Sequence, residues 1–330
     1  MHCLTIETMK NRNEYFDFLR GIAIIFVVGI HTFLYTGSET EFEINIKTYA
    51  YQALFCAVPI FLAISGFFLS KIDFSPKGAV YSFWRKQIPK IYLPCIVWSI
   101  PLFVRAFFYS NYPLINCLVY YFLCGLGVFY FVSVIIQLYI LLPFIAKLCN
   151  KKRVVFFAFV SLFAVFMMNI APTNSVLFSL GVSILWIGFF YIGIYLSKST
   201  NREYSLLFAV LLVCGYFLNN IEVDFWAGLN RKCHDYRLSS FLYSFGVILV
   251  LFSKKIENLY HKKQHILKYA ISYIGKISFG IYLVHYLLTF YMPFKTWIAN
   301  WVTILAVSIL IILISKRLFP VFSKKYLGFY

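Results

Sequence analysis

Arg20 and His31 lie in one apolar stretch with a spacing that could let both take part in one reaction. At about 100° per residue, the eleven steps between them turn a helix through ~1100°, within about 20° of three full turns, so both side chains share one stripe. Their Cα atoms lie roughly 16 Å apart, about half of the ~30 Å hydrocarbon core. Asp17 precedes Arg20 by three residues, where an i, i+3 pair could hold the guanidinium. Because imidazole titrates near neutrality, His31 could take a proton from a hydroxyl and return it as a general base.

His31 also has a purely structural interpretation, since membrane histidines commonly hydrogen-bond between packed helices. Its shared stripe with Arg20 and Asp17 favours function. Ionisable groups are costly in lipid and normally face a protein interior or a wet cavity. A line of charge from the cytoplasmic edge to a mid-membrane histidine is therefore a candidate reaction path.

His285 is the second histidine within an apolar span, in the sequence Ser278-Phe-Gly-Ile-Tyr-Leu-Val-His285. It lies roughly two thirds of the way across its span, as His31 does in the first span. Two histidines at matching depth can meet if their helices are neighbours. The alternative is a structural histidine that hydrogen-bonds to Tyr282 or to the backbone.

A basic segment within the expected inner loop 71–90 contains Arg85, Lys86 and Lys90 among aromatic residues. Such a patch could hold the phosphates of a nucleotide-type donor. It could equally be ordinary positive-inside charge in contact with anionic lipid.

Other reactive residue types are not assigned chemistry. Ser65–Gly66 is typical of close helix packing, and no nucleophile elbow accompanies Ser65. The eight cysteines are scattered without a C-x-x-C pattern, so we expect small buried hydrophobes and neither a metal site nor a disulfide framework.

These residues must be positioned by membrane helices. The 330 residues are 62% hydrophobic and only 13% charged, whereas soluble domains average about 25% charged. The sequence predicts an all-α, polytopic protein with one membrane domain over 1–330 and no soluble domain. Ten spans are expected, at approximately 18–36, 50–70, 91–109, 128–147, 154–170, 178–197, 204–219, 238–253, 271–291 and 298–315.

The net charge of +18 is distributed in alternate loops, one set of which holds 23 of the 30 Lys and Arg residues. This is the positive-inside pattern, so we expect both termini in the cytoplasm and no nucleic-acid partner. Residues 113–127 read as an interfacial or re-entrant lead-in broken at glycines. The outer loop 219–236 could contribute to an acceptor site.

Taken together in their order along the chain, these segments resemble the acyltransferase 3 family of membrane-bound, acyl-CoA-dependent O-acyltransferases, which modify surface glycans. The resemblance covers nearly the whole chain. It is carried by the segments 15–31 with its arginine–ten residues–histidine spacing, 58–67, 85–94, 131–143 and 277–285. One departure is Lys90, where the family usually has a second arginine, which weakens a bidentate phosphate contact.

The resemblance implies an acyl-CoA donor, usually acetyl-CoA, on the cytoplasmic side and a glycan or glycolipid hydroxyl as acceptor. It implies a multi-pass protein of the inner or plasma membrane, with His31 as general base or transient acyl acceptor, assisted by Arg20, Asp17 and His285. The donor would contact Arg20, Arg85, Lys86 and Lys90, with no metal. The main alternative is a transporter or flippase of lipid-linked glycans, which the absence of a visible internal repeat disfavours. A structural or sensory subunit would leave the alignment of Arg20 with His31 as coincidence.

Overall fold

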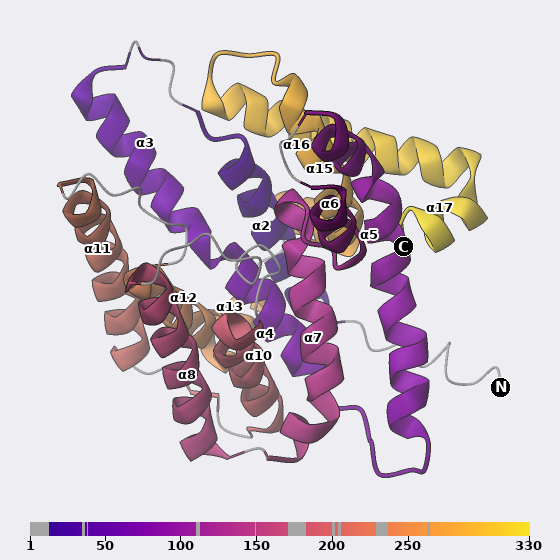
Figure 1. Cartoon of the computed structure of the whole chain (residues 1–330). Coiled ribbons are helices and arrows are strands. Elements are labelled where there is room, and N and C mark those ends of the chain that lie inside the picture. Colours follow the sequence, from indigo (N-terminus) through magenta and orange to yellow (C-terminus); the bar gives the residue numbers. More distant parts are fainter. Residues whose placement is uncertain are drawn as a thin grey trace.

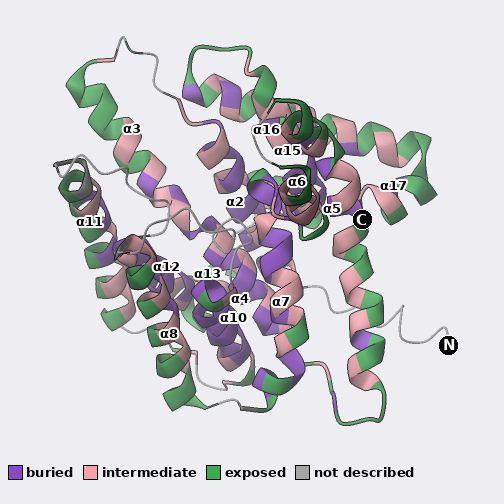
Figure 2. Ribbon diagram, viewed as in Figure 1, coloured by how far each residue is buried: buried purple, intermediate pink, exposed green. Residues whose placement is uncertain are grey.

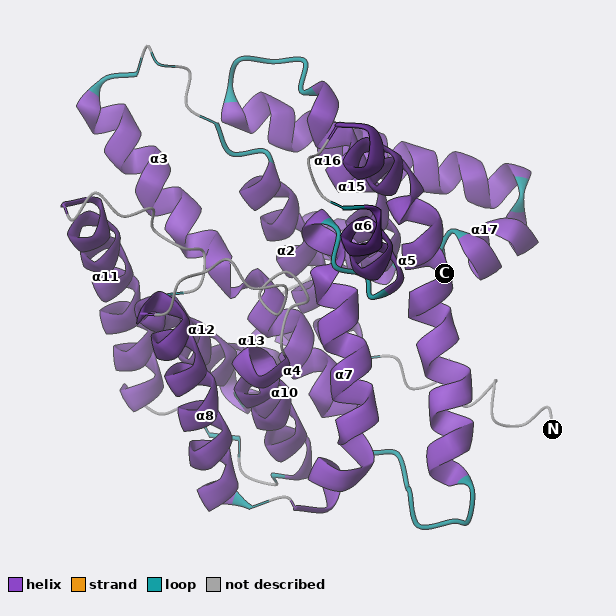
Figure 3. Ribbon diagram, viewed as in Figure 1, coloured by secondary structure: helices purple, strands orange, loops and turns teal. Residues whose placement is uncertain are grey.

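The computed structural model describes residues 13–34, 37, 39–109, 113–148, 150–170, 183–199, 202–203, 206–228, 237–262 and 265–330. Every regular element in these ranges is a helix, as Figure 3 shows. The helices pack into a bundle whose buried residues gather on the central helices, while the outer helices expose apolar side chains (Figures 1 and 2). Exposed apolar surface on long helices is the pattern of a bundle that faces lipid.

Within the described residues, six regions are long and apolar enough to cross a bilayer. They are α3 with η1 and α4 (Glu41–Ala53, Leu54–Cys56, Ala57–Leu69), α5 (Ala79–Tyr109), η2 with α7 (Gly127–Phe129, Tyr130–Ile145), α8 (Lys151–Ile170), α11 (Leu206–Gly228) and α16 (Trp297–Leu318). Two bent pairs raise the number to eight: α12 (Leu238–Leu251) with α13 (Lys254–Lys262), and α14 (Ile266–Lys276) with α15 (Ser278–Leu288). The chain is thus an all-α, multi-pass membrane protein.

Two expected spans fall outside this set. The helix α2 (Glu14–His31) carries three charged residues within 18 positions, and α10 (Ser183–Lys198) has 16 residues. Part of the expected span 178–197 lies outside the described residues. Short helices complete the described fold: α6 (Leu114–Phe122), η3 (Ala146–Leu148), η4 (Thr289–Tyr291) and α17 (Pro320–Tyr326).

The helix α2 is clamped from two sides. A Cβ atom on Gly21 would lie 2.0 Å from the carbonyl oxygen of Ile271, and one on Gly275 would lie 1.7 Å from that of Asp17. The backbones of α2 and α14 therefore touch at this crossing, which only glycine permits. Near the other end, the indole N–H groups of Trp297 and Trp301 in α16 donate to carbonyl oxygens of α2 at 2.9 and 2.7 Å.

This second contact lies where the helix ends, at His31, before the end of the expected span 18–36. Residues 35 and 36 of that span lie outside the described part of the chain. The Trp297 indole N–H donates to the carbonyl oxygen of Gly29, and the Thr32 hydroxyl donates to the carbonyl oxygen of Val28 at 2.9 Å. Carbonyl groups of the last turn thus find side-chain partners where the helical ladder stops.

The packing role predicted for Ser65–Gly66 is confirmed for Gly66, whereas Ser65 lines the cavity described below. A Cβ atom on Gly66 would lie 2.0 Å from the carbonyl oxygen of Phe190, and one on Gly193 would lie 2.0 Å from that of Ala63. The helices α4 and α10 thus cross in backbone contact, as small residues allow in membrane bundles.

Two expected loops are helical. The expected inner loop 71–90 is wrong from residue 79 onward, because α5 begins at Ala79 and continues through three prolines. Membrane helices tolerate proline when neighbouring helices satisfy the freed backbone groups. The outer loop 219–236 is likewise wrong over 219–228, which belong to α11. Residues 229–236 lie outside the described part of the chain.

The chain bends sharply in residues 113–127 and in the expected span 271–291. Residues 113–127 contain the short helix α6 and a turn in which Cys124 and Gly127 adopt φ of 56° and 57°. A Cβ atom on Gly127 would lie 2.8 Å from the Tyr286 ring. Glycine is therefore favoured there both by the positive φ and by the lack of space for a side chain. The expected span 271–291 bends by 78° between α14 and α15, which turns His285 toward the bundle centre.

We expect Gly275→Val to destabilise the protein by about 3 kcal/mol or more, because its side chain would overlap the backbone of α2. Ala270→Val is the matched control, since residue 270 lies on the exposed face of the same helix. Valine has a higher intrinsic helix propensity than glycine, so only the steric overlap predicts a loss. Thermal unfolding in detergent measures it. Equal unfolding temperatures for the two variants would contradict the backbone contact.

Candidate active site

A cavity of about 390 Å³ lies inside the bundle beside α2. Both Arg20 and His31 line it, so it runs alongside about three turns of that helix. Side chains of α4, α5, α7, α10, α12 and α15 form the other walls. The volume is within the range of about 300–1,000 Å³ that is typical of small-molecule sites.

At the start of α2, Arg20 is held by the predicted i, i+3 partner. Its Nη1 donates to Asp17 Oδ1 at 2.8 Å, and its guanidinium lies 5.2 Å from the centroid of the Phe68 ring. Asp17 is fully buried, whereas the Arg20 side chain is 27% exposed. The arrangement fixes the guanidinium while one part of it remains able to meet a ligand.

At the other end of the helix, His31 and His285 do meet. Their ring centroids are 5.4 Å apart, and the Tyr286 ring lies 5.7 Å from that of His31. His31 lines the cavity, whereas His285 is fully buried behind it. The bend between α14 and α15 brings this second histidine to the end of α2.

The hydrogen bonds of His285 define its tautomer. Its Nδ1 lies 2.7 Å from the carbonyl oxygen of Tyr282 and 3.1 Å from that of Ile281. Carbonyl oxygens only accept, so Nδ1 carries the proton and Nε2 bears a lone pair. That Nε2 is buried and has no hydrogen-bond partner among the described residues. A buried acceptor without a donor is the kind of group that a functional site leaves unsatisfied.

The residues of the basic segment differ in whether they line the cavity. Lys90 lines the cavity together with Gln87, one turn earlier. Arg85 and Lys86 are exposed and do not line it. At about 100° per residue, Arg85 lies about 160° around the helix from Gln87, on the opposite face.

Arg20 and Lys90 lie in helices that begin on the same side of the bundle. The continuous helix from α3 through α4 crosses once between α2 and α5 and so returns the chain to that side. Each of the two residues lies in the first half of its helix. The cavity is thus cationic toward one end and is lined by His31 toward the other.

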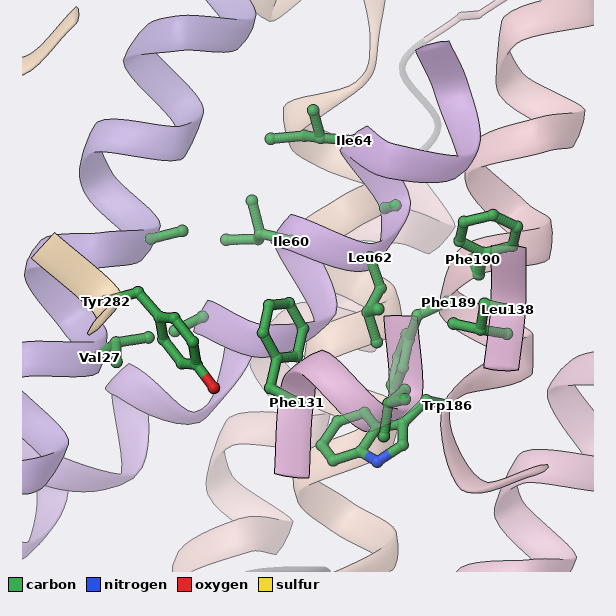
Figure 4. Packing of buried hydrophobic residues seen from close by; sticks show 14 of the residues in the cluster. Val27, Ile60, Leu62, Ile64, Phe131, Leu138, Trp186, Phe189, Phe190 and Tyr282 are labelled. Atoms are coloured by element: carbon green, nitrogen blue, oxygen red, sulfur yellow. The ribbon is translucent and has the colours of Figure 1, made fainter. Parts of the chain in front are cut away.

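The walls between these ends are aromatic. The Tyr282 hydroxyl donates to the carbonyl oxygen of Val128 at 2.6 Å, and its ring meets that of Phe131 edge-on at 5.6 Å. Figure 4 shows these two rings side by side, between Val27 of α2 and Ile60 of α4. The Tyr282 ring also lies 6.0 Å from that of His285, so the aromatic wall reaches the histidine pair.

The sequence analysis missed a further wall, formed by the first turns of α10 and α12. Trp186, Ser240 and Ser244 line the cavity there. The spacing of the two serines, four residues apart in an apolar helix, is the signal that could have placed them on one stripe. Within the described ranges, no cluster of His, Cys, Asp and Glu side chains has the arrangement of a metal site.

Comparison with protein families gives a match over most of the chain. A family model described as an acyltransferase domain, that of the acyltransferase 3 family, matches residues 13–315. The match runs from the start of α2 into α16 and includes the cavity's two ends. Neither the curated proteins nor the solved structures give a significant match. The chain belongs to the acyltransferase 3 family and is a multi-pass membrane acyltransferase.

Proposed function

We propose that the protein moves an acyl group, foremost acetyl, from cytoplasmic acyl-CoA to a hydroxyl of a cell-surface glycan or glycolipid. The observation that carries the proposal is that Arg20 and His31 line one cavity within a chain of the acyltransferase 3 family. A cation for the donor and a base for the acceptor would then lie about 16 Å apart along α2. The protein would act in the inner or plasma membrane, among anionic lipids.

The donor is proposed to enter from the end that holds Arg20 and Lys90. Basic loops favour the cytoplasmic face, where acyl-CoA is made available. Its phosphates would lie among the cations, and its thioester would extend between the aromatic walls toward His31. The acceptor hydroxyl would approach from the opposite end.

His31 is proposed as the general base. One ring nitrogen would take the proton of the acceptor hydroxyl while that oxygen attacks the thioester carbonyl. The carbon–sulfur bond then breaks, and the imidazolium returns the proton to the leaving thiolate. The products are an O-acyl ester and free coenzyme A, so atoms and charge balance without a metal.

His285 is proposed to set the tautomer of His31. Its Nε2 lone pair would accept the N–H of the neighbouring imidazole, which would leave the other nitrogen of His31 unprotonated toward the cavity. His285 thus acts through His31, as a positioning residue.

We expect His31→Gln to lower the acyl transfer rate by about 100-fold or more, since general-base catalysis contributes that much. The measurement is transfer from radiolabelled acetyl-CoA by purified protein in vesicles that contain a glycan extract from the host. His261→Gln is the control, because residue 261 is exposed at the end of α13. Equal rates for the two variants would refute the catalytic role. Vesicle translocation of glycan without label transfer would favour the flippase.

For the positioning role, we expect His285→Leu to lower kcat by about 5- to 10-fold, the worth of one hydrogen bond, with little change in KM for acetyl-CoA. His285→Gln restores an acceptor atom near the position of Nε2 and should recover part of the loss. If glutamine and leucine variants have the same kcat, the hydrogen bond to His31 plays no part.

We expect Arg20→Gln to raise KM for acetyl-CoA by about tenfold or more, because a charge-assisted contact to phosphate is lost. Arg317→Gln removes an exposed positive charge at the end of α16 and serves as the control. Steady-state kinetics over a range of donor concentrations separates KM from kcat. A purely structural role for Arg20 would show instead as a lowered unfolding temperature with unchanged KM.

A further inference from the structure

The last described residues of the chain form part of the cavity wall. Tyr330 lines the cavity beside Phe279, with the two rings stacked at 6.4 Å. The Tyr330 hydroxyl donates to the carbonyl oxygen of Lys90 at 2.8 Å. Residues 327–330 therefore lie against the cationic end of the cavity, beside α5 (Figure 1).

Packing holds this segment firmly in place. Phe329 is 2% exposed and lies 6.0 Å from the Trp98 ring, and the Trp98 indole donates to the carbonyl oxygen of Leu327 at 3.2 Å. Gly328 has a φ of 71°, and a Cβ atom there would lie 2.9 Å from Phe279. The turn before these residues is fixed as well, because the Ser323 hydroxyl donates to the carbonyl oxygen of Ser315 at 2.7 Å.

This arrangement gathers positive charge at the cavity rim. Lys86 lies one helical turn before Lys90 on α5, and α17, which carries Lys324, packs against α5. Both lysines therefore repel the charge of Lys90, which itself lines the cavity. All three side chains are exposed, and none of the ion pairs between described residues includes them. Like charges held together repel one another, so the cluster is destabilising unless an anion occupies it.

Basic clusters at a membrane surface also attract anionic lipid headgroups, through the same phosphate chemistry. Two features favour a ligand that enters the protein. Lys90 and Arg20 continue the charge into the cavity wall, and Tyr330 and Phe279 line the same space with aromatic surface. A molecule with phosphates at one end and an extended arm at the other fits this arrangement of cations at the rim and aromatic side chains farther in.

We infer that Lys86, Lys90 and Lys324, brought together by the docking of residues 327–330 against α5, form the site for the phosphate groups of the acyl-CoA donor. The inference rests on the proposed function and adds the segment after α16 to the donor site. Lys324 supplies a charge from a part of the chain beyond residue 315, where the family match ends.

The test is equilibrium binding of coenzyme A to the full protein in nanodiscs of zwitterionic lipid, where lipid headgroups carry no net charge. We expect Lys324→Gln to weaken binding by about fivefold or more, and Lys324→Arg to retain most of the affinity. Lys325→Gln is the matched control: it removes the same charge from the next residue of α17, which is also exposed and points about 100° further around the helix. Unfolding temperatures check that all variants remain folded.

Equal affinity for Lys324→Gln and Lys325→Gln would overturn the inference. A Lys324→Gln effect that appears only when the nanodiscs contain anionic lipid would also overturn it and assign the cluster to lipid. If the unaltered protein binds no coenzyme A at all, the proposed donor itself is wrong. Normal binding that is insensitive to residue 324 removes only the present inference.

Discussion

The structure depends on keeping one charged helix out of lipid. The helix α2 carries Asp17, Arg20 and His31 within an otherwise apolar sequence, and exposure of such groups to hydrocarbon would be costly. The bundle meets this constraint by burying most of α2. The glycine crossing with α14 brings the backbones into contact at one end, and two indole N–H groups of α16 take carbonyl oxygens at the other.

The same constraint produces the cavity. A charge inside a membrane protein needs a partner or a wet space, and Arg20 has both: the buried carboxylate of Asp17 and a cavity wall. His31 faces the far part of that space, backed by a histidine whose tautomer is fixed by backbone carbonyls. Burial of α2 thus places a cation, aromatic side chains and an imidazole along one cavity.

The ends and bends of the surrounding helices bring further residues to the cavity. The 78° turn between α14 and α15 brings His285 behind His31, and the turn at Cys124 and Gly127 lets Tyr286 pack closely. Residues 319–330 fold back so that Tyr330 reaches the cationic end of the cavity. These breaks interrupt otherwise regular helices at the site itself, as is common where membrane proteins hold ligands.

The sequence by itself determined the all-α membrane class, because composition and apolar run length depend only on the chain. It also determined the Asp17–Arg20 pair and the common stripe of Arg20 and His31, since both follow from helical periodicity within one element. The tight packing at Gly66 belongs to the same group, because small residues in membrane helices have few other uses.

Only the tertiary structure decided which residues from different helices meet. The approach of His285 to His31 needed the bend at the start of α15, and a bend leaves no periodic signal in an apolar run. The start of α5 at Ala79 was missed because its polar residues and prolines are typical of a loop. In a membrane bundle, however, neighbouring helices can satisfy the backbone groups that a proline leaves without a hydrogen bond. Lys324 and Tyr330 lie more than 200 residues from Lys90 in the sequence. Their place at the cavity follows from side-chain packing between α5, α15 and the final turns, which no local pattern encodes.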